Sequence, residues 1–290
     1  MKRIHRLMIL VFGLLLSLAG SALAGDRIEK NLKLDPGGTL SMDTGGGDII
    51  VRGDSASGAH VVVTSNVADL AEVYDLQFEE AAHAVRITAH RRSAFDWPHH
   101  FSLKFEISVP RQTSLELKTG GGDVRTQDLD GAVQLRTSGG DVNVSEVKGD
   151  VNAETSGGDM EVRQLTGNLV LRTSGGDIKA RGISGRVDVH SAGGDVEVSL
   201  VPGNAHGGEI GTSGGEVTVA LDPQVNLDLE ASAGGGDVES GLAITINSQS
   251  HSNLRATMGK GGELLRLSTT GGDIRLRALW ARVHGSRETG

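Results

Sequence analysis

The sequence predicts an all-β protein: a β-solenoid of parallel stacked coils with an 18-residue period and two short strands per coil, preceded by a less regular β region. The pentapeptide TSGGD recurs at 137–141, 155–159 and 173–177, which sets the period. Apolar and polar residues alternate on both sides of each glycine pair, as in strands with one buried face. The chain has 43 glycines but only 3% aromatic residues, which fits a narrow core between two closely spaced sheets.

The acid after each glycine pair marks the repeat and defines its elements. In the unit of Asp141, the apolar residues Val133 and Leu135 alternate with polar residues before the turn. Val142 and Val144 do the same after it. A second glycine turn, ten residues before the acid, completes the coil. An antiparallel meander of hairpins is the alternative, but it would leave one long sheet without a cover. The repeat-turn acids are Asp48, Asp123, Asp141, Asp159, Asp177, Asp195, Glu216, Asp237 and Asp273.

The repeat-turn acids are predicted to be structural, with each carboxylate accepting an N–H group of its own glycine turn. Calcium is the functional alternative for a periodic acidic column. The calcium-binding nonapeptide has the pattern Gly-Gly-x-Gly-x-Asp, whereas this unit reads Gly-Gly-Asp-apolar, so no metal and no cofactor are predicted. The threonines four residues before the acids share the inward parity, and we expect a buried hydroxyl ladder that bonds to neighbours or turn backbone: Thr119, Thr137, Thr155 and Thr173.

Four segments follow from the pattern. Residues 1–24 read as a signal peptide, with basic residues, an apolar run from Leu7 to Leu18, and cleavage after Ala24. Residues 25–112 form an N-terminal β region and cap, with one complete repeat around Asp48, strands at 61–64, 85–88 and 101–109, and a short helix within 69–75. Residues 113–279 hold the solenoid repeats, with bulges expected at 202–203 and 222–223. Residues 280–290 form a polar tail, and 25–279 is predicted to be one continuous elongated domain.

Composition narrows the possible functions. Cleavage would remove three basic residues and leave 25 cationic against 37 anionic side chains, a net charge of −12, which disfavours binding to nucleic acid or anionic lipid. The absence of cysteine excludes disulfides, thiolate metal sites and lipoprotein anchoring. No membrane span is expected after signal cleavage. We expect an exported protein, periplasmic or extracellular.

One segment differs in composition from the rest. The stretch RRSAFDWPHHF at 91–101 interrupts two strands and gathers aromatic, basic and histidine side chains. It can be a plug that closes the first coil, or a loop that binds a ligand or partner. The candidate binding residues are Arg91, Arg92, Phe95, Trp97, His99, His100 and Phe101. No catalytic residues are predicted, because the one nucleophile-like motif, GTSGG at 211–215, is the turn of the repeat itself.

The opening LDPGGTLSMDTGGGDIIVRG, the stretch FEISVPRQTSLELKTGGGDV, the repeated TSGGDV and the closing LSTTGGDIRL resemble the bacterial "putative adhesin" family of β-strand repeat domains. The resemblance covers about Leu34 to Leu276 and implies an exported β-solenoid without catalytic residues or cofactor. We therefore expect a non-catalytic structural or adhesion-like protein of the cell envelope that binds a surface or polymer. The alternatives are a periplasmic module that binds a protein partner through 91–101, and an envelope polysaccharide hydrolase or lyase.

Overall fold

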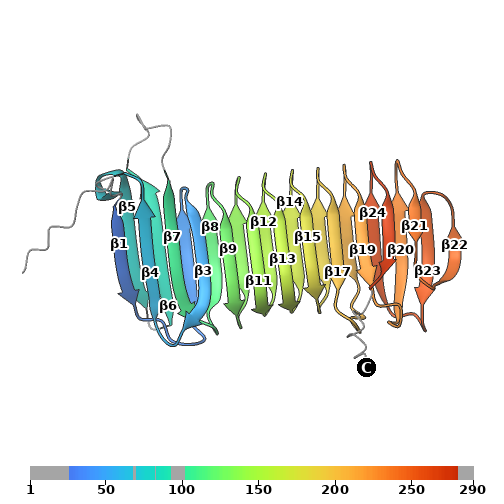
Figure 1. Cartoon of the computed structure of the whole chain (residues 1–290), viewed down its shortest axis with the longest axis horizontal. Helices are drawn as coiled ribbons and strands as arrows, with labels where there is room; N and C mark the ends of the chain where they lie inside the picture. The colour runs from blue at the N-terminus through green and yellow to red at the C-terminus, as the bar shows by residue number, and fades with distance from the viewer. Residues whose placement is uncertain (1–25, 68–69, 82, 93–101, 280–290) are drawn as a thin grey trace, which may run out of the picture.

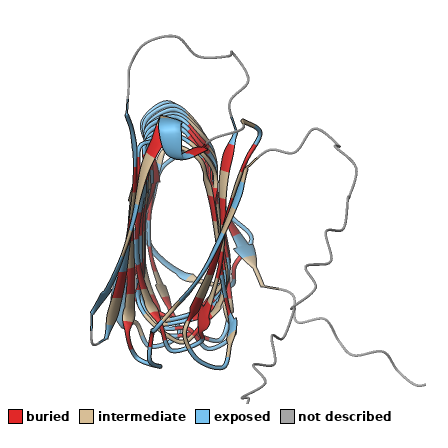
Figure 2. Cartoon of the chain, turned by 90° about the vertical axis from the view of Figure 1, so that its left-hand side faces the viewer, coloured by how far each residue is buried: buried red, intermediate tan, exposed pale blue. Residues whose placement is uncertain are grey.

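The structure is a computed structural model that describes residues 26–67, 70–81, 83–92 and 102–279. It is a rod made of two long sheets that face each other (Figure 1). Sheet A has 12 strands and sheet B has 13. Viewed from the N-terminal end, the sheets form two walls whose buried residues lie between them (Figure 2). The predicted β-solenoid is confirmed, whereas the predicted signal peptide and polar tail lie outside the described residues.

The central coils follow the predicted pattern of one strand in each sheet. In sheet B these strands are β8 (Ser114–Thr119), β10 (Val133–Thr137), β12 (Val151–Thr155), β14 (Leu169–Thr173) and β16 (Val187–Ser191). In sheet A they are β9 (Val124–Leu129), β11 (Val142–Lys148), β13 (Met160–Thr166), β15 (Ile178–Ile183) and β17 (Val196–Leu200). Neighbours pair in parallel with an offset of one repeat, as Val133 pairs with Val151. The alternating apolar residues therefore stack into continuous buried rows.

The first coil stacks directly on the central coils although it is distant in sequence. It consists of β2 (Thr39–Thr44) and β3 (Asp48–Ser55), which pair in parallel with β8 and β9. The intervening chain continues the two sheets outward through β4 (Ala59–Ser65), α1 (Leu70–Val73), β5 (Tyr74–Ala81), β6 (Ala84–Arg91) and β7 (Leu103–Pro110). Strand β1 (Arg27–Leu32) forms the edge of sheet A, and β5 forms the edge of sheet B. Antiparallel pairs at this end, β1–β4, β4–β7 and β5–β6, replace the parallel stacking.

The C-terminal coils are not stacked in sequence order. Strands β18 (Gly208–Thr212) and β19 (Val217–Leu221) are followed in space by β24 (Glu263–Thr269) and β25 (Ile274–Ala278). The earlier strands β20 (Leu227–Ala233) and β21 (Val238–Ser240) lie beyond them, with the hairpin of β22 (Thr245–Gln249) and β23 (Asn253–Met258) at the end. The chain turns back because β20 and β23 are antiparallel. Strand β24 then lies between β18 and β20 and pairs in parallel with both.

Ion pairs stabilise this end of the rod, where the coils are stacked out of sequence order. The Glu230 carboxylate on β20 accepts hydrogen bonds from Arg255 on β23, at 2.7 Å, and from Arg266 on β24, at 3.1 Å. These hydrogen bonds hold the pKa of Glu230 below its ordinary value. One carboxylate thus links three neighbouring strands of sheet B.

The described residues include no helix with the length and apolar character needed to cross a membrane.

Candidate functional site

The glycine turns are held by the inward threonines, as the sequence predicts. In most coils the hydroxyl accepts an N–H from the second glycine of its own turn and donates to a glycine carbonyl of the preceding coil, whereas Thr119 makes only the donated bond, to Gly47 O. For Thr173 these distances are 3.3 Å to Gly176 N and 3.2 Å to Gly158 O. The same pair of bonds is made by Thr137, Thr155, Ser191, Thr212 and Thr269. The hydroxyl ladder therefore caps the turns and also joins successive coils.

The repeat-turn acids have a different donor from the expected one. In seven of the repeat-turn acids, Oδ1 accepts the backbone N–H of the equivalent acid in the next coil rather than an N–H of its own turn. The bond from Asp177 N to Asp159 Oδ1 is 2.8 Å long, and the bond from Asp159 N to Asp141 Oδ1 is 2.9 Å long. Equivalent bonds join Asp123 to Asp48, Asp141 to Asp123, Asp195 to Asp177, Glu216 to Asp195 and Asp237 to Asp273. Since the threonine already caps the turn, the carboxylate is available to satisfy the amide that begins the next strand.

This geometry predicts different outcomes for two substitutions of one acid. Asp159→Ala should lower the free energy of unfolding by about 1 kcal/mol, because the Asp177 amide loses its acceptor at a site that water can reach. Asp159→Asn keeps Oδ1 and removes one charge from the column, so its stability should be near that of the wild type. Asn168 already makes such a bond, accepting Arg186 N at 3.1 Å. Urea denaturation measures both variants, and an equal loss for the two would contradict the role of Oδ1.

The acidic column was also the candidate for calcium. Within the described ranges, no group of three or more His, Cys, Asp or Glu side chains is arranged to hold a metal ion.

The predicted binding loop is only partly described. Arg92 is engaged in the fold: its Nε donates to Ala71 O at 3.0 Å, and its Nη2 contacts Asp75 Oδ1 at 3.2 Å. Arg91 lines a shallow hollow beside the first glycine turn, together with Tyr74, whose pKa is raised by burial. Phe95, Trp97, His99, His100 and Phe101 lie outside the described residues, so their binding role stays a prediction.

A longer groove lies on the outer face of sheet B, along the edge where its strands enter the glycine turns. It encloses about 770 Å³ and crosses six coils. Its charged side chains occupy one row, because the paired strands place them in register. In spatial order the row is Asp43, Lys118, Arg136, Glu154, Arg172 and His190. The repeat period places five of these residues, from Lys118 to His190, in one column, each five positions before a repeat-turn acid, but only the structure shows the groove and places Asp43 beside Lys118.

The groove residues are accessible and only singly paired. Lys118 Nζ lies 3.1 Å from Asp43 Oδ2, and Arg136 Nε lies 3.2 Å from Glu154 Oε2. Arg172 turns toward Asp188 on β16, at 3.3 Å. The side chains of the three cations are 50–65% exposed, so a ligand can reach them.

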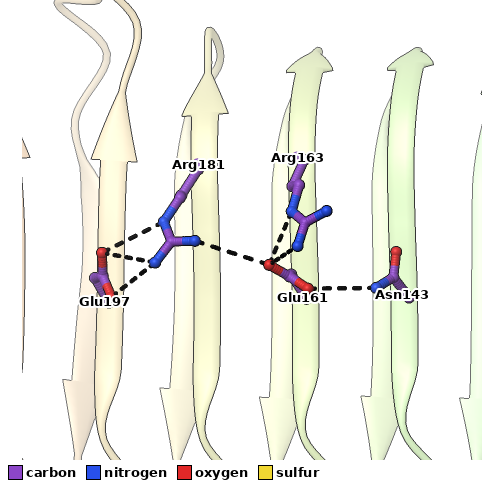
Figure 3. A network of polar contacts seen from close by, with 5 residues as sticks. All are labelled: Asn143, Glu161, Arg163, Arg181 and Glu197. Carbon is purple, nitrogen blue, oxygen red and sulfur yellow. Dashed lines mark hydrogen bonds and ion pairs between the residues drawn. The ribbon is translucent and has the colours of Figure 1, made fainter.

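Charge pairs occur on both outer faces, but on sheet A they form a connected network, whereas each cation of the groove row contacts a single carboxylate. Figure 3 shows Glu161 between Asn143, Arg163 and Arg181, and Arg181 also contacts Glu197 at 3.2 Å. This network connects four neighbouring strands and satisfies its cations internally. Sheet A is therefore the less suitable face for a charged ligand.

Residues 40–277, which contain the groove and nearly all of both sheets, match the family model described as Toastrack DUF4097. The chain belongs to this family. The Toastrack match covers most of the solenoid and both coils that stack out of sequence order. No curated protein matches the sequence.

Two solved structures are similar to this chain at low sequence identity. A protein from Bacteroides fragilis described as a "putative adhesin" is 12% identical, with a TM-score of 0.53, and the match covers 89% of this chain and 100% of that one. A "putative lipid binding protein" from Parabacteroides distasonis is 12% identical, with a TM-score of 0.42, and covers 87% of this chain and 96% of that one. At these identities the Bacteroides structure supports the Toastrack fold alone.

Proposed function

We propose that this Toastrack protein is an exported, non-catalytic binding protein that holds an acidic polysaccharide of the cell surface along the groove of sheet B. The observation that carries the proposal is the row of outward side chains from Asp43 to His190, which the strand register places one per coil. The description of the Bacteroides protein as a "putative adhesin" agrees with a surface-binding role.

The shape of the groove favours a polymer over a small molecule. The six coils are separated by five spacings of ~4.8 Å, which gives a row about 24 Å long. The groove is open along this length, whereas small-molecule sites are enclosed pockets that bury most of the ligand. Sugar units of an extended polysaccharide are comparable in length to one coil, so successive units can meet equivalent side chains of successive coils.

The charge of the groove favours an anionic polymer. Lys118, Arg136 and Arg172 outnumber Asp43 and Glu154 in the groove, whereas the whole chain has a net charge of −9. Nucleic acid is less suitable, because the lining contains no Phe, Tyr or Trp side chain on which bases could stack.

The test uses the chain from Gly25, with polygalacturonic acid as the acidic probe and dextran as the neutral one. The double variant Arg136→Glu with Arg172→Glu should bind polygalacturonic acid about tenfold more weakly or worse, which corresponds to about 1.4 kcal/mol. The matched control is Arg163→Glu with Arg181→Glu on sheet A, which changes the net charge equally and should bind like the wild type. Isothermal titration calorimetry at two salt concentrations measures all three proteins. Equal losses of affinity in both variants would show that binding depends on the net charge of the protein and not on the groove. No binding by the wild type would refute the proposal.

The second candidate is capture of a protein partner through residues 91–101, which the aromatic and histidine content of that segment favours. Trp97→Ala with His99→Ala separates the two candidates. This variant should keep polysaccharide binding if the groove binds the ligand, and should lose partner capture if the loop is the site.

A further inference from the structure

The two sheets do not end together at the C-terminal end of the rod. The hairpin of β22 and β23 extends sheet B past β21, which is the last strand of sheet A and only three residues long. Figure 1 shows β22 as the outermost strand at this end. Strand β22 pairs only with β23, so its other edge offers unpaired backbone groups. All five residues of β22 are exposed.

Ile246 on β22 lies at the open end of the core. It pairs with Ala256 on β23, so the two side chains lie on the same face of sheet B. Ala256 is only 2% exposed, whereas Ile246, on the outermost strand of sheet B, is 51% exposed. Among the described residues, Ile246 is the most exposed large hydrophobic side chain.

The other edges of the described sheets are protected. Charged side chains occur on β1, at Arg27, Glu29 and Lys30, and on β5, at Asp75, Glu79 and Glu80. The edge at β21 is covered by the turn after β22, because Val238 N donates to His251 O at 2.8 Å. By contrast, residues 241–250 contain no charged side chain. Charges and coverage are the usual means of preventing strand-to-strand association, and β22 has neither.

We propose that two copies of this chain associate through β22, pairing antiparallel about a two-fold axis so that sheet B continues from one rod into the other. A two-fold contact uses the same surface on both copies. The uncharged β22 edge fits this requirement, because it does not repel itself as the acidic β5 edge would. The contact also covers each Ile246 with the open core end of the other copy. The dimer is a straight rod of double length that presents two grooves, which raises the avidity for a polymer without any new contact.

The contact is small, so the association depends on concentration. One five-residue strand per copy buries far less than the ~800 Å² per partner of a stable interface. We therefore expect a reversible dimer, with the monomer dominant in dilute solution.

Sedimentation velocity of the chain from Gly25, over a roughly hundredfold range of concentration, tests the proposal. The wild type should shift from monomer to dimer, and Ile246→Lys should remain monomeric because it buries a charge at the contact. Leu264→Lys is the matched control: Leu264 is 40% exposed on β24, three strands from the edge, and this variant should behave like the wild type. A wild type that stays monomeric, or an equal effect of both variants, overturns the proposal.

The absence of cysteine allows a second, direct test. Single cysteines placed in turn at residues 245–249 should form a disulfide-linked dimer under a mild oxidant at the position nearest the two-fold axis, where the two Cα atoms approach within about 7 Å. Gln77→Cys on β5 is the control and should form no more dimer than random collision gives. A dimer that crosslinks through β5 and not through β22 would refute the proposed contact.

Discussion

Gly176→Ala is expected to lower the free energy of unfolding by about 3 kcal/mol or more, whereas Gly175→Ala should change it by no more than about 0.5 kcal/mol. A β-carbon at Gly176 would overlap the carbonyl oxygen of Gly158 in the preceding coil. At Gly175 the nearest atom to such a carbon is Gly157 O, at 3.7 Å, an ordinary contact. Of these two adjacent glycines, Gly175 has room for a β-carbon and Gly176 does not.

Urea denaturation followed by circular dichroism measures both variants. The overlap involves backbone on both sides, so the coil spacing itself must change to relieve it. The second glycine of each central turn has the same close contact, at Gly140, Gly158, Gly194 and Gly215. A similar loss for Gly175→Ala and Gly176→Ala would show that the coils are less tightly stacked than the structure indicates.

Thr173→Val should lower the free energy of unfolding by about 2–4 kcal/mol, although valine has nearly the same shape as threonine. Thr173 is 5% exposed, and its hydroxyl is bonded to two buried backbone groups, Gly158 O and Gly176 N. Valine leaves both of these groups without a partner in a place that water does not reach. Each unsatisfied group costs about 1–3 kcal/mol.

Thr173→Ser is the matched variant, because serine keeps the hydroxyl and loses only a methyl group, worth about 0.8 kcal/mol. The next coil shows that serine suffices: Ser191 Oγ lies 2.8 Å from Gly176 O and 3.0 Å from Gly194 N. Thermal unfolding and urea denaturation should rank the proteins as wild type, serine variant, then valine variant. If valine were tolerated as well as serine, the ladder would be a packing feature rather than a set of required hydrogen bonds.

The two variants weaken different parts of the same turn. Gly176→Ala disturbs the distance between coils, whereas Thr173→Val removes bonds without changing shape. Gly176 does not line the groove, and Thr173, which does, is only 5% exposed, so each variant should affect polysaccharide binding only through stability. Binding measured well below the unfolding temperature therefore distinguishes a damaged scaffold from a damaged site.

The sequence by itself determined the repeating part of the fold. The period of 18, the alternation of Val133 and Leu135 with polar neighbours, and the inward threonines predicted two strands per coil and their buried faces, and the structure confirms them. These features can be predicted from the sequence because each of them arises within one coil. Side chains of a strand alternate between its two faces with a period of two residues. A glycine is needed where the backbones of two coils approach closely. Both requirements are local, and every coil repeats them.

Only the tertiary structure decided which coils are neighbours. The coil of Asp48 stacks on that of Asp123 across 75 residues, and the coil of Asp273 lies between those of Glu216 and Asp237. The unit pattern cannot reveal this order, because each coil offers nearly the same backbone edge to any parallel partner. The bond of each carboxylate to the next coil, the groove of sheet B and the open β22 edge all depend on that order. These three features could therefore not be predicted from the repeat pattern alone.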